Sequence, residues 1–155
     1  LGQFIDMERL LRQIDSEISA SGGKRSRSRA LIIGIFFRAG RHLTVDELTR
    51  KVRARNRDIG AATVYRTLKL LARLGYAKEL DFGEGVRRYE SSLTAHHDHL
   101  VCTGCGKVSE FEEPRIESLQ EEVAKKHGFL PTMHRLAIYG TCPECVPPEL
   151  RENAE

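Results

Sequence analysis

At 155 residues, with 40% hydrophobic and 30% charged side chains, the chain is long enough to bury one good core or two small ones. Its longest apolar run covers residues 30–37, well short of the ~18–20 residues that a membrane-spanning helix needs. No secretory signal or internal repeat is visible, which predicts a cytoplasmic protein with no membrane partner. Met7 is the first methionine, so residues 1–6 are expected to be upstream or added sequence.

The net charge of +3 is unevenly distributed. Residues 1–94 hold 19 Lys and Arg against 11 Asp and Glu, whereas residues 95–155 hold 6 against 11. Between Lys24 and Arg73 the ratio is 14 basic to 3 acidic residues. A basic half of this kind is typical of nucleic-acid binding, with an ordinary solvated basic surface as the alternative.

Helical periodicity begins at Met7 and predicts a first helix over Met7–Ala20. Ser26 or Ser28 is expected to cap a second helix that ends near Gly40. The residues predicted to face inward from this second helix are Leu31, Ile32, Ile35 and Phe36.

A third helix is predicted after Thr44, where Glu47 completes a capping box. A fourth is predicted over Ala61–Leu74, closed by Gly75 in a left-handed conformation. The fourth helix has an apolar stripe on one face and a row of small and cationic residues on another. That row consists of Ala62, Arg66, Lys69 and Arg73.

Two strands, Tyr76–Phe82 and Val86–Glu90, flank a turn at 83–85 and predict a hairpin. Helices followed by a β-hairpin are typical of the winged helix-turn-helix, in which the last helix enters the major groove. We therefore expect a winged-helix domain over residues 1–90 and a hinge over residues 91–95.

The remainder, residues 96–155, reads as a small α/β domain. Strands are expected at His97–Cys102, Val108–Glu112 and Met133–Cys142, with a helix from Pro114 to near Gly128. Since so short a segment rarely folds alone, bound zinc and dimerisation are expected to stabilise it.

All four cysteines fall into two C-x-x-C pairs, and such pairs favour one tetrahedral zinc site. Two disulfides or a thioredoxin-like redox pair are the alternatives; the first suits an exported protein, and the second needs a cysteine pair opening a helix. The predicted zinc ligands are Cys102, Cys105, Cys142 and Cys145.

Just before Cys102 stands a second cluster, His96-His97-Asp98-His99. Side chains alternate in a strand, so His97 and His99 point one way while His96 and Asp98 point the other. This predicts two metal sites with imidazole and carboxylate donors, which suit Fe(II), Mn(II) and Zn(II). Ordinary hydrogen-bonded histidines are the alternative. The candidate further donors are His42, Glu90, Glu110, Glu117, His127 and His134.

Three segments together resemble the ferric uptake regulator family of dimeric, metal-responsive bacterial transcription repressors. They are Ala62-Thr-Val-Tyr-Arg66, residues 96–107 and Tyr139-Gly-Thr-Cys142, and the resemblance extends from about Lys24 to Cys145. It implies an α+β fold with an N-terminal winged helix-turn-helix domain and a small α/β dimerisation domain with a four-cysteine zinc site. It also implies a palindromic, AT-rich DNA operator and a homodimer or tetramer.

Residue by residue, the resemblance implies the following sites. Structural zinc is held by Cys102, Cys105, Cys142 and Cys145. The regulatory site consists of His42, Glu90, His97 and His99, with Glu110 as a fifth ligand. A further metal site consists of His96, Asp98, Glu117 and His134. The implied DNA contacts are Lys24, Ala62, Thr63, Tyr65, Arg66 and Lys69.

The sequence departs from the common patterns of the family at two places, and the second bears on the regulatory metal. Ser26-Arg-Ser-Arg29 replaces the usual Thr-Pro-x-Arg, and Glu90 stands where peroxide-sensing members tend to have Asp. Zinc-sensing members more often have a further Cys ahead of the H-x-H, which is His97-Asp98-His99 here, and this chain has none there. Fe(II) is therefore the expected co-repressor, with Mn(II) or Zn(II) able to substitute, and a zinc- or peroxide-responsive repressor is the alternative. A metal-dependent hydrolase or metal-storage protein is the remote alternative, although no catalytic motif is present.

Overall fold

The computed structural model describes residues 6–40, 42–83, 85–147 and 149. The chain forms two compact units, Leu1–Thr94 and Ala95–Glu155. Residues 1–5 and Glu84 of the expected turn lie outside the described residues. Across the described ranges, no helix is both long enough and apolar enough to cross a membrane.

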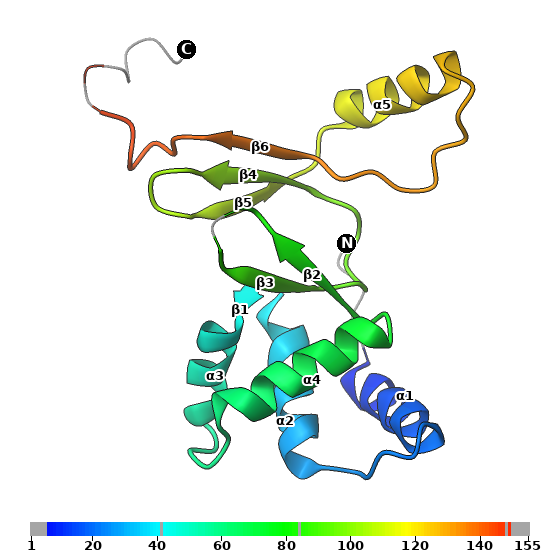
Figure 1. Ribbon diagram of the computed structural model, residues 1–155, viewed down its shortest axis with the longest axis vertical. Coiled ribbons are helices and arrows are strands. Elements are labelled where there is room, and N and C mark those ends of the chain that lie inside the picture. The colour runs from blue at the N-terminus through cyan, green and yellow to red at the C-terminus, as the bar shows by residue number, and fades with distance from the viewer. Residues whose placement is uncertain (1–5, 41, 84, 148, 150–155) are drawn as a thin grey trace. The chain divides into compact units, whose positions relative to one another are not determined.

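The described part of the first unit contains four helices and a small sheet (Figure 1). The helices are α1 (Met7–Ala20), α2 (Arg27–Ala39), α3 (Val45–Arg53) and α4 (Ala61–Arg73). Ser26 caps α2, since its side chain accepts from the N–H of Arg29. The predicted capping box of α3 is present: Thr44 accepts from the N–H of Glu47, whose carboxylate accepts from the N–H of Thr44 at 2.8 Å.

The wing is a three-stranded antiparallel sheet with the order β1-β3-β2. The predicted hairpin consists of β2 (Ala77–Asp81) and β3 (Arg87–Ser91). The third strand, β1 (Leu43–Thr44), pairs with β3 through Leu43 opposite Tyr89. Sequence periodicity did not predict β1 because two residues are too few to show alternation.

One apolar core fills the first unit, and the stripe of α4 lies fully inside it. Ile33 and Phe37 of α2 are also buried, whereas Leu31 and Ile35, predicted to face inward, are only half-buried. The buried face of α2 is therefore displaced from the predicted one, because α1, α3 and α4 all pack against this helix. The core residues contributed by α4 are Val64, Leu68 and Leu71.

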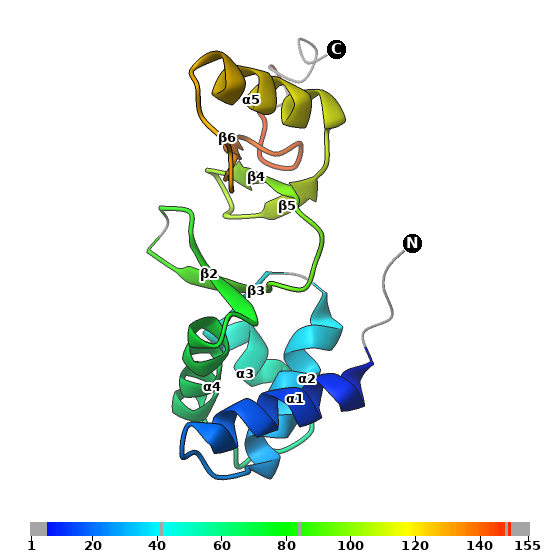
Figure 2. The same cartoon turned by 90° about the vertical axis from the view of Figure 1, so that its right-hand side faces the viewer.

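The second unit is a three-stranded sheet with the order β5-β4-β6, and α5 runs alongside it (Figure 2). Its elements are β4 (Asp98–Cys102), β5 (Val108–Phe111), α5 (Pro114–Lys126) and β6 (Ala137–Gly140). The β4 strand pairs antiparallel with β5 and parallel with β6. The expected strand at Met133–Cys142 was too long, because β6 pairs with β4 only where His99–Cys102 run beside it.

The second unit has almost no apolar core of its own. In its described part, Val101 and Cys102 are the buried apolar side chains, and α5 buries none of its residues. Leu119 and Val123, both on α5, are 60% and 50% exposed. The hydrophobic effect within one chain therefore contributes little to this unit, and other interactions must hold it together.

Candidate metal centres

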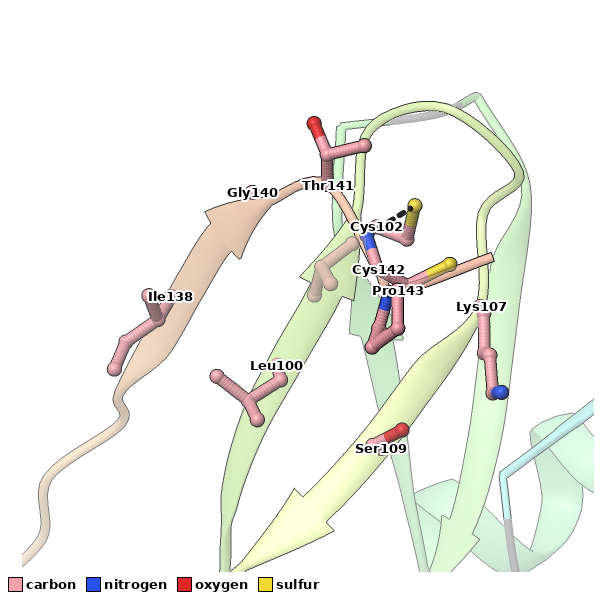
Figure 3. Close-up of a pocket in the computed structure, with 10 residues that line it drawn as sticks. Leu100, Cys102, Lys107, Ser109, Ile138, Gly140, Thr141, Cys142 and Pro143 are labelled. Carbon is pink, nitrogen blue, oxygen red and sulfur yellow. Dashed lines mark hydrogen bonds between the residues drawn. The ribbon is translucent and has the colours of Figure 1, made fainter. Parts of the chain in front are cut away.

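The four cysteines come together at the ends of two adjacent strands. Cys102 ends β4, and Cys142 follows β6, which runs parallel to β4. The N–H of Thr103 donates to the carbonyl of Gly140 at 2.8 Å, so the two C-x-x-C turns start from a shared backbone contact. Figure 3 shows Cys102 and Cys142 side by side, with the N–H of Cys142 donating to Cys102 Sγ at 3.2 Å.

The sulfurs are spaced as a metal site requires. All four lie within 4.8 Å of one another, and Cys105 Sγ is 3.8 Å from Cys142 Sγ. A tetrahedral zinc site with Zn–S bonds of about 2.3 Å places its sulfurs about 3.8 Å apart. All four are free thiols rather than disulfides. The donor set and its spacing therefore fit Zn(II).

Backbone donors stabilise a thiolate in this cluster. N–H groups of Cys142, Cys105 and Gly104 lower the pKa of Cys102 to about 6. Hydrogen bonds to the sulfurs of Cys105 and Cys142 raise the pKa of Cys145, because they favour its neutral thiol. Without a cation the four thiols cannot all ionise together, and a divalent metal removes that conflict.

Sequence reasoning had not singled out Gly104, although it lies between two ligands. A Cβ at this position would lie 3.2 Å from Cys145 Cβ and 3.3 Å from Cys145 Sγ. The first C-x-x-C turn therefore packs directly against the second, and any side chain at position 104 would press on Cys145, which holds the fourth sulfur. Lys107 also links the two turns, since its Nζ lies 2.8 Å from Glu144 Oε1.

A second cluster joins β4 to α5 with nitrogen and oxygen donors. His96 Nε2 lies 3.4 Å from Asp98 Oδ1 and 3.6 Å from Glu117 Oε1. His134 Nε2 lies 3.7 Å and 3.3 Å from the same two oxygens. Metal–ligand bonds of about 2.0–2.1 Å in a tetrahedral site place donor atoms about 3.3–3.4 Å apart. The structure thus brings together the four residues predicted for the additional metal site.

The polar atoms of this cluster lack the partners that buried groups normally have. Asp98 is 1% exposed, and neither of its carboxylate oxygens has a hydrogen-bond partner. His134 Nε2 is also buried without one. Because a buried carboxylate without compensation is strongly unfavourable, the cluster fits a bound divalent cation.

Four of the remaining predicted donors form two pairs, one pair in each unit. In the first unit, His42 Nε2 lies 2.6 Å from Glu90 Oε2, and Lys78 Nζ lies 3.4 Å from Glu90 Oε1. Glu90 is on β3, directly opposite Lys78 of β2. The wing thus fixes the Glu90 carboxylate beside an imidazole.

In the second unit, His97 and His99 have ring centroids 5.1 Å apart, as strand alternation predicts. His97 Nδ1 lies 3.0 Å from the carbonyl of Ala95. A carbonyl only accepts, so Nδ1 carries the proton and Nε2 carries the ring's lone pair. Glu110 lies opposite His99 across β4 and β5, and its Oε1 is 4.0 Å from His97 Nε2. His127 instead caps the C-terminus of α5 and belongs to none of the described clusters.

The predicted DNA-contacting residues lie on α4 and ahead of α2. Ala62, Tyr65 and Arg66 are exposed, as is Lys24. Thr63 is half-buried and accepts from Arg66 Nη2 at 3.5 Å. Lys69 does not simply continue the row into solvent, because its Nζ lies 2.8 Å from Glu79 Oε2 on the wing.

Comparison with known proteins decides among the interpretations. A model of the ferric uptake regulator family matches residues 20–139. The chain belongs to this family. Ferric uptake regulator family proteins are transcription regulators rather than enzymes, which sets aside the hydrolase alternative.

Relatives and solved structures agree with this assignment. The chain is 40% identical to the ferric uptake regulation protein of Bordetella parapertussis over 131 residues, covering 84% of this chain and 94% of the relative. The ferric uptake regulator structure from Helicobacter pylori matches with a TM-score of 0.87 and 32% identity, covering 96% of this chain and 99% of that one; it reveals three functional metal binding sites. A zinc-bound manganese uptake regulator matches with a TM-score of 0.69 and 38% identity, covering 85% and 98%.

These matches confirm the predicted fold class, an α+β chain with a winged helix-turn-helix followed by a small α/β unit. Metal-responsive DNA binding as a homodimer is the activity common to the family. Ferric uptake regulator structures with iron and with manganese are both among the matches, so membership alone does not select one ion.

Replacing Gly104 by alanine should weaken zinc retention. The added methyl group would press on Cys145, so zinc should leave Gly104→Ala at least about tenfold faster than wild type when a chelator is added. Zinc release is followed with a chromogenic chelator. Gly140→Ala is the matched control, because a Cβ there meets nothing within 4 Å. Equal release rates for Gly104→Ala and wild type would contradict this account of the turn packing.

Replacing Asp98 by asparagine should leave thermal stability unchanged or higher without exchangeable metal, and should reduce the stabilisation that added metal gives. In zinc-loaded protein lacking exchangeable metal, Asp98→Asn should be at least as stable as wild type, because it removes a buried negative charge. Added Mn(II) should raise the Tm of wild type by several degrees and that of Asp98→Asn much less. Thermal denaturation followed by circular dichroism measures both. A variant that gains as much Tm from Mn(II) as wild type would show that Asp98 is not a ligand.

Proposed function

We propose that the chain is a metal-dependent transcriptional repressor in which Fe(II) is the co-repressor. The regulatory site would combine His42 and Glu90 of the first unit with His97 and His99 of the second, and Glu110 as a fifth ligand. Zn(II) at the four cysteines would be structural. When bound, Fe(II) would supply one positively charged centre that donors from both units share.

The observation that carries this proposal is where the donors lie relative to the unit boundary. The boundary between Thr94 and Ala95 separates His42 and Glu90 from His97 and His99. Each pair is already assembled by its own unit: the first by the wing, the second by β4 and its contact with Ala95. A cation that needs both pairs would therefore restrict the orientation of one unit relative to the other.

The chemistry of the donors supports a division of labour between permanent and exchangeable metal. Four thiolates form a soft, closed set that holds zinc tightly. Imidazoles and carboxylates form harder sets, from which Fe(II) or Mn(II) exchanges more readily. His96, Asp98, Glu117 and His134 would hold a further exchangeable ion that fastens α5 to β4.

Restricting the hinge would raise DNA affinity by fixing the spacing between the two winged helices of the dimer. Two winged helices contact two half-sites of a palindromic, AT-rich operator only if their spacing matches the spacing of the half-sites. A hinge that samples other angles lowers the apparent affinity by the fraction of competent dimers. Metal binding would raise that fraction, with Tyr65 and Arg66 on α4 contacting the bases and Lys24 lying near the minor groove.

The exposed apolar surface of the second unit supports the homodimer. Large apolar side chains there stand in solvent in the single chain, and a cavity of about 230 Å³ opens beside Leu100 and Ile138 (Figure 3). An apolar surface of this kind marks an interface. The exposed residues are Leu100, Leu119, Val123, Phe129, Leu130, Met133, Ile138 and Tyr139.

The second candidate is a repressor of the same architecture that responds to manganese or zinc. Imidazole and carboxylate donors bind Mn(II), Fe(II) and Zn(II), with affinities that follow the Irving–Williams order. The match to a zinc-bound manganese uptake regulator favours keeping this candidate. Anaerobic titration of each ion against DNA binding would separate the two.

Replacing both His97 and His99 by alanine should abolish metal-stimulated DNA binding. The structural zinc and the fold should persist, since neither residue belongs to the four-cysteine cluster. Affinity for a palindromic duplex is measured by fluorescence anisotropy with and without Fe(II) under anaerobic conditions. Wild type should bind at least about tenfold more tightly with metal, and the double variant should show no gain.

His127→Ala is the matched control, because His127 is a histidine of the same unit outside the described clusters. It should respond to Fe(II) as wild type does. Metal-stimulated binding that survives in His97→Ala/His99→Ala would remove the inter-unit site from the mechanism.

A further inference from the structure

A single carboxylate joins the fourth helix to both strands of the wing. Glu79, on β2, presents Oε2 to Lys69 Nζ of α4 at 2.8 Å. Its other oxygen, Oε1, accepts from Arg87 Nη1 of β3. Glu79 is 21% exposed, whereas Lys69 and Arg87 are more open to solvent. One acidic side chain thus holds two cations from two different elements.

The register of the two strands brings these groups together. Glu79 lies opposite Tyr89, and Arg87 is two residues from Tyr89 on the same face. Tyr89 is fully buried beneath them, which fixes the local backbone. Hydrogen bonding from Lys69 lowers the pKa of Glu79, and the bonds to Glu79 raise the pKa of Lys69 and of Arg87. All three groups are therefore charged at neutral pH.

Both cations belong to elements that meet DNA in a winged helix. The fourth helix enters the major groove and the wing lies over the adjacent backbone. Cations on these elements ordinarily bind phosphate, which adds affinity for every sequence alike. In this chain the carboxylate of Glu79 lies between Lys69 and Arg87 and competes with phosphate for both cations.

We propose that Glu79 is a specificity-determining residue, which withholds Lys69 and Arg87 from sequence-independent phosphate contacts. The inference rests on the proposed DNA-binding function and adds to it. Before either cation can give its full charge to a phosphate, it must break or share its charge-assisted hydrogen bond to Glu79. Base contacts from Tyr65 and Arg66 are unaffected by that cost, because neither residue has a described bond to Glu79. Glu79 thereby lowers binding to random DNA more than binding to an operator.

Replacing Glu79 by glutamine should strengthen binding to random DNA. Metal-loaded protein is titrated into a mixed-sequence duplex at several salt concentrations, with affinity read by fluorescence anisotropy. Glu79→Gln should bind at least about threefold more tightly than wild type at low salt, and its log–log salt slope should steepen by about one to two per protomer. Adding Lys69→Gln to Glu79→Gln should reverse part of the gain.

Glu8→Gln is the charge-matched control. Glu8 is exposed on α1 and pairs with Arg12 at 3.4 Å, so its replacement removes the same charge from the same unit without touching α4 or the wing. An equal gain in Glu8→Gln would show a general charge effect and overturn the proposal. So would weaker binding of Glu79→Gln to all DNA.

A second variant tests the proposal without altering Glu79. In Lys69→Gln/Arg87→Gln the salt slope on the mixed-sequence duplex should stay close to wild type, since both cations are already withheld. A slope shallower by about two per protomer would mean that they bind phosphate in the wild type, and would overturn the proposal. If wild type fails to bind DNA with or without metal, the proposed function itself fails. Metal-dependent binding with no effect of Glu79→Gln would refute only the role of Glu79.

Discussion

The second unit depends on the four-cysteine cluster at the ends of β4 and β6, because its described part has almost no apolar core. Val101 and Cys102 are the buried apolar side chains in its described part, and α5 buries none. Four sulfurs at tetrahedral spacing can supply a substitute, since metal–thiolate bonds there would tie one C-x-x-C turn to the other. Asp98 and Glu117 would play the corresponding role between β4 and α5, where their carboxylates lie beside the imidazole of His96. Bound metal would therefore stand where a larger domain has a hydrophobic core.

The short strand β4 contributes residues to all three candidate metal sites. β4 ends in the zinc ligand Cys102, and alternation sends Asp98 to one face and His99 to the other. Soft and hard donors are thus kept apart along a few residues, which would let one ion stay while others exchange. The first unit needs no such support, because its helices and wing enclose a continuous core. It can therefore present α4 as a rigid surface whose charge is moderated by Glu79.

Much of the fold and of the candidate sites was predictable from sequence, because helix caps, side-chain periodicity and ligand spacing all depend on residues close together in the chain. Helix caps at Thr44 and Gly75, the stripe of α4, the two C-x-x-C pairs and the alternation of His96 to His99 each reflect short-range geometry. What sequence missed depends on tertiary context. The two-residue β1 is defined only by its partner on β3, and the early start of β6 was wrong because pairing with β4 sets its length. The crowding at Gly104 joins residues far apart in the chain, and the bonds of Glu79 join three neighbouring elements. Periodicity within one element reports neither.

The central claim is that metal at the proposed regulatory site and DNA stabilise the same state of the dimer. Linkage then requires the effect to be reciprocal, so DNA must tighten metal binding by the factor by which metal tightens DNA binding. The direct measurement is the affinity of zinc-loaded protein for Fe(II) under anaerobic conditions, with and without a saturating palindromic duplex. The account predicts tighter Fe(II) binding in the presence of the duplex, by a factor equal to that measured for DNA. An Fe(II) affinity that the duplex leaves unchanged would contradict it.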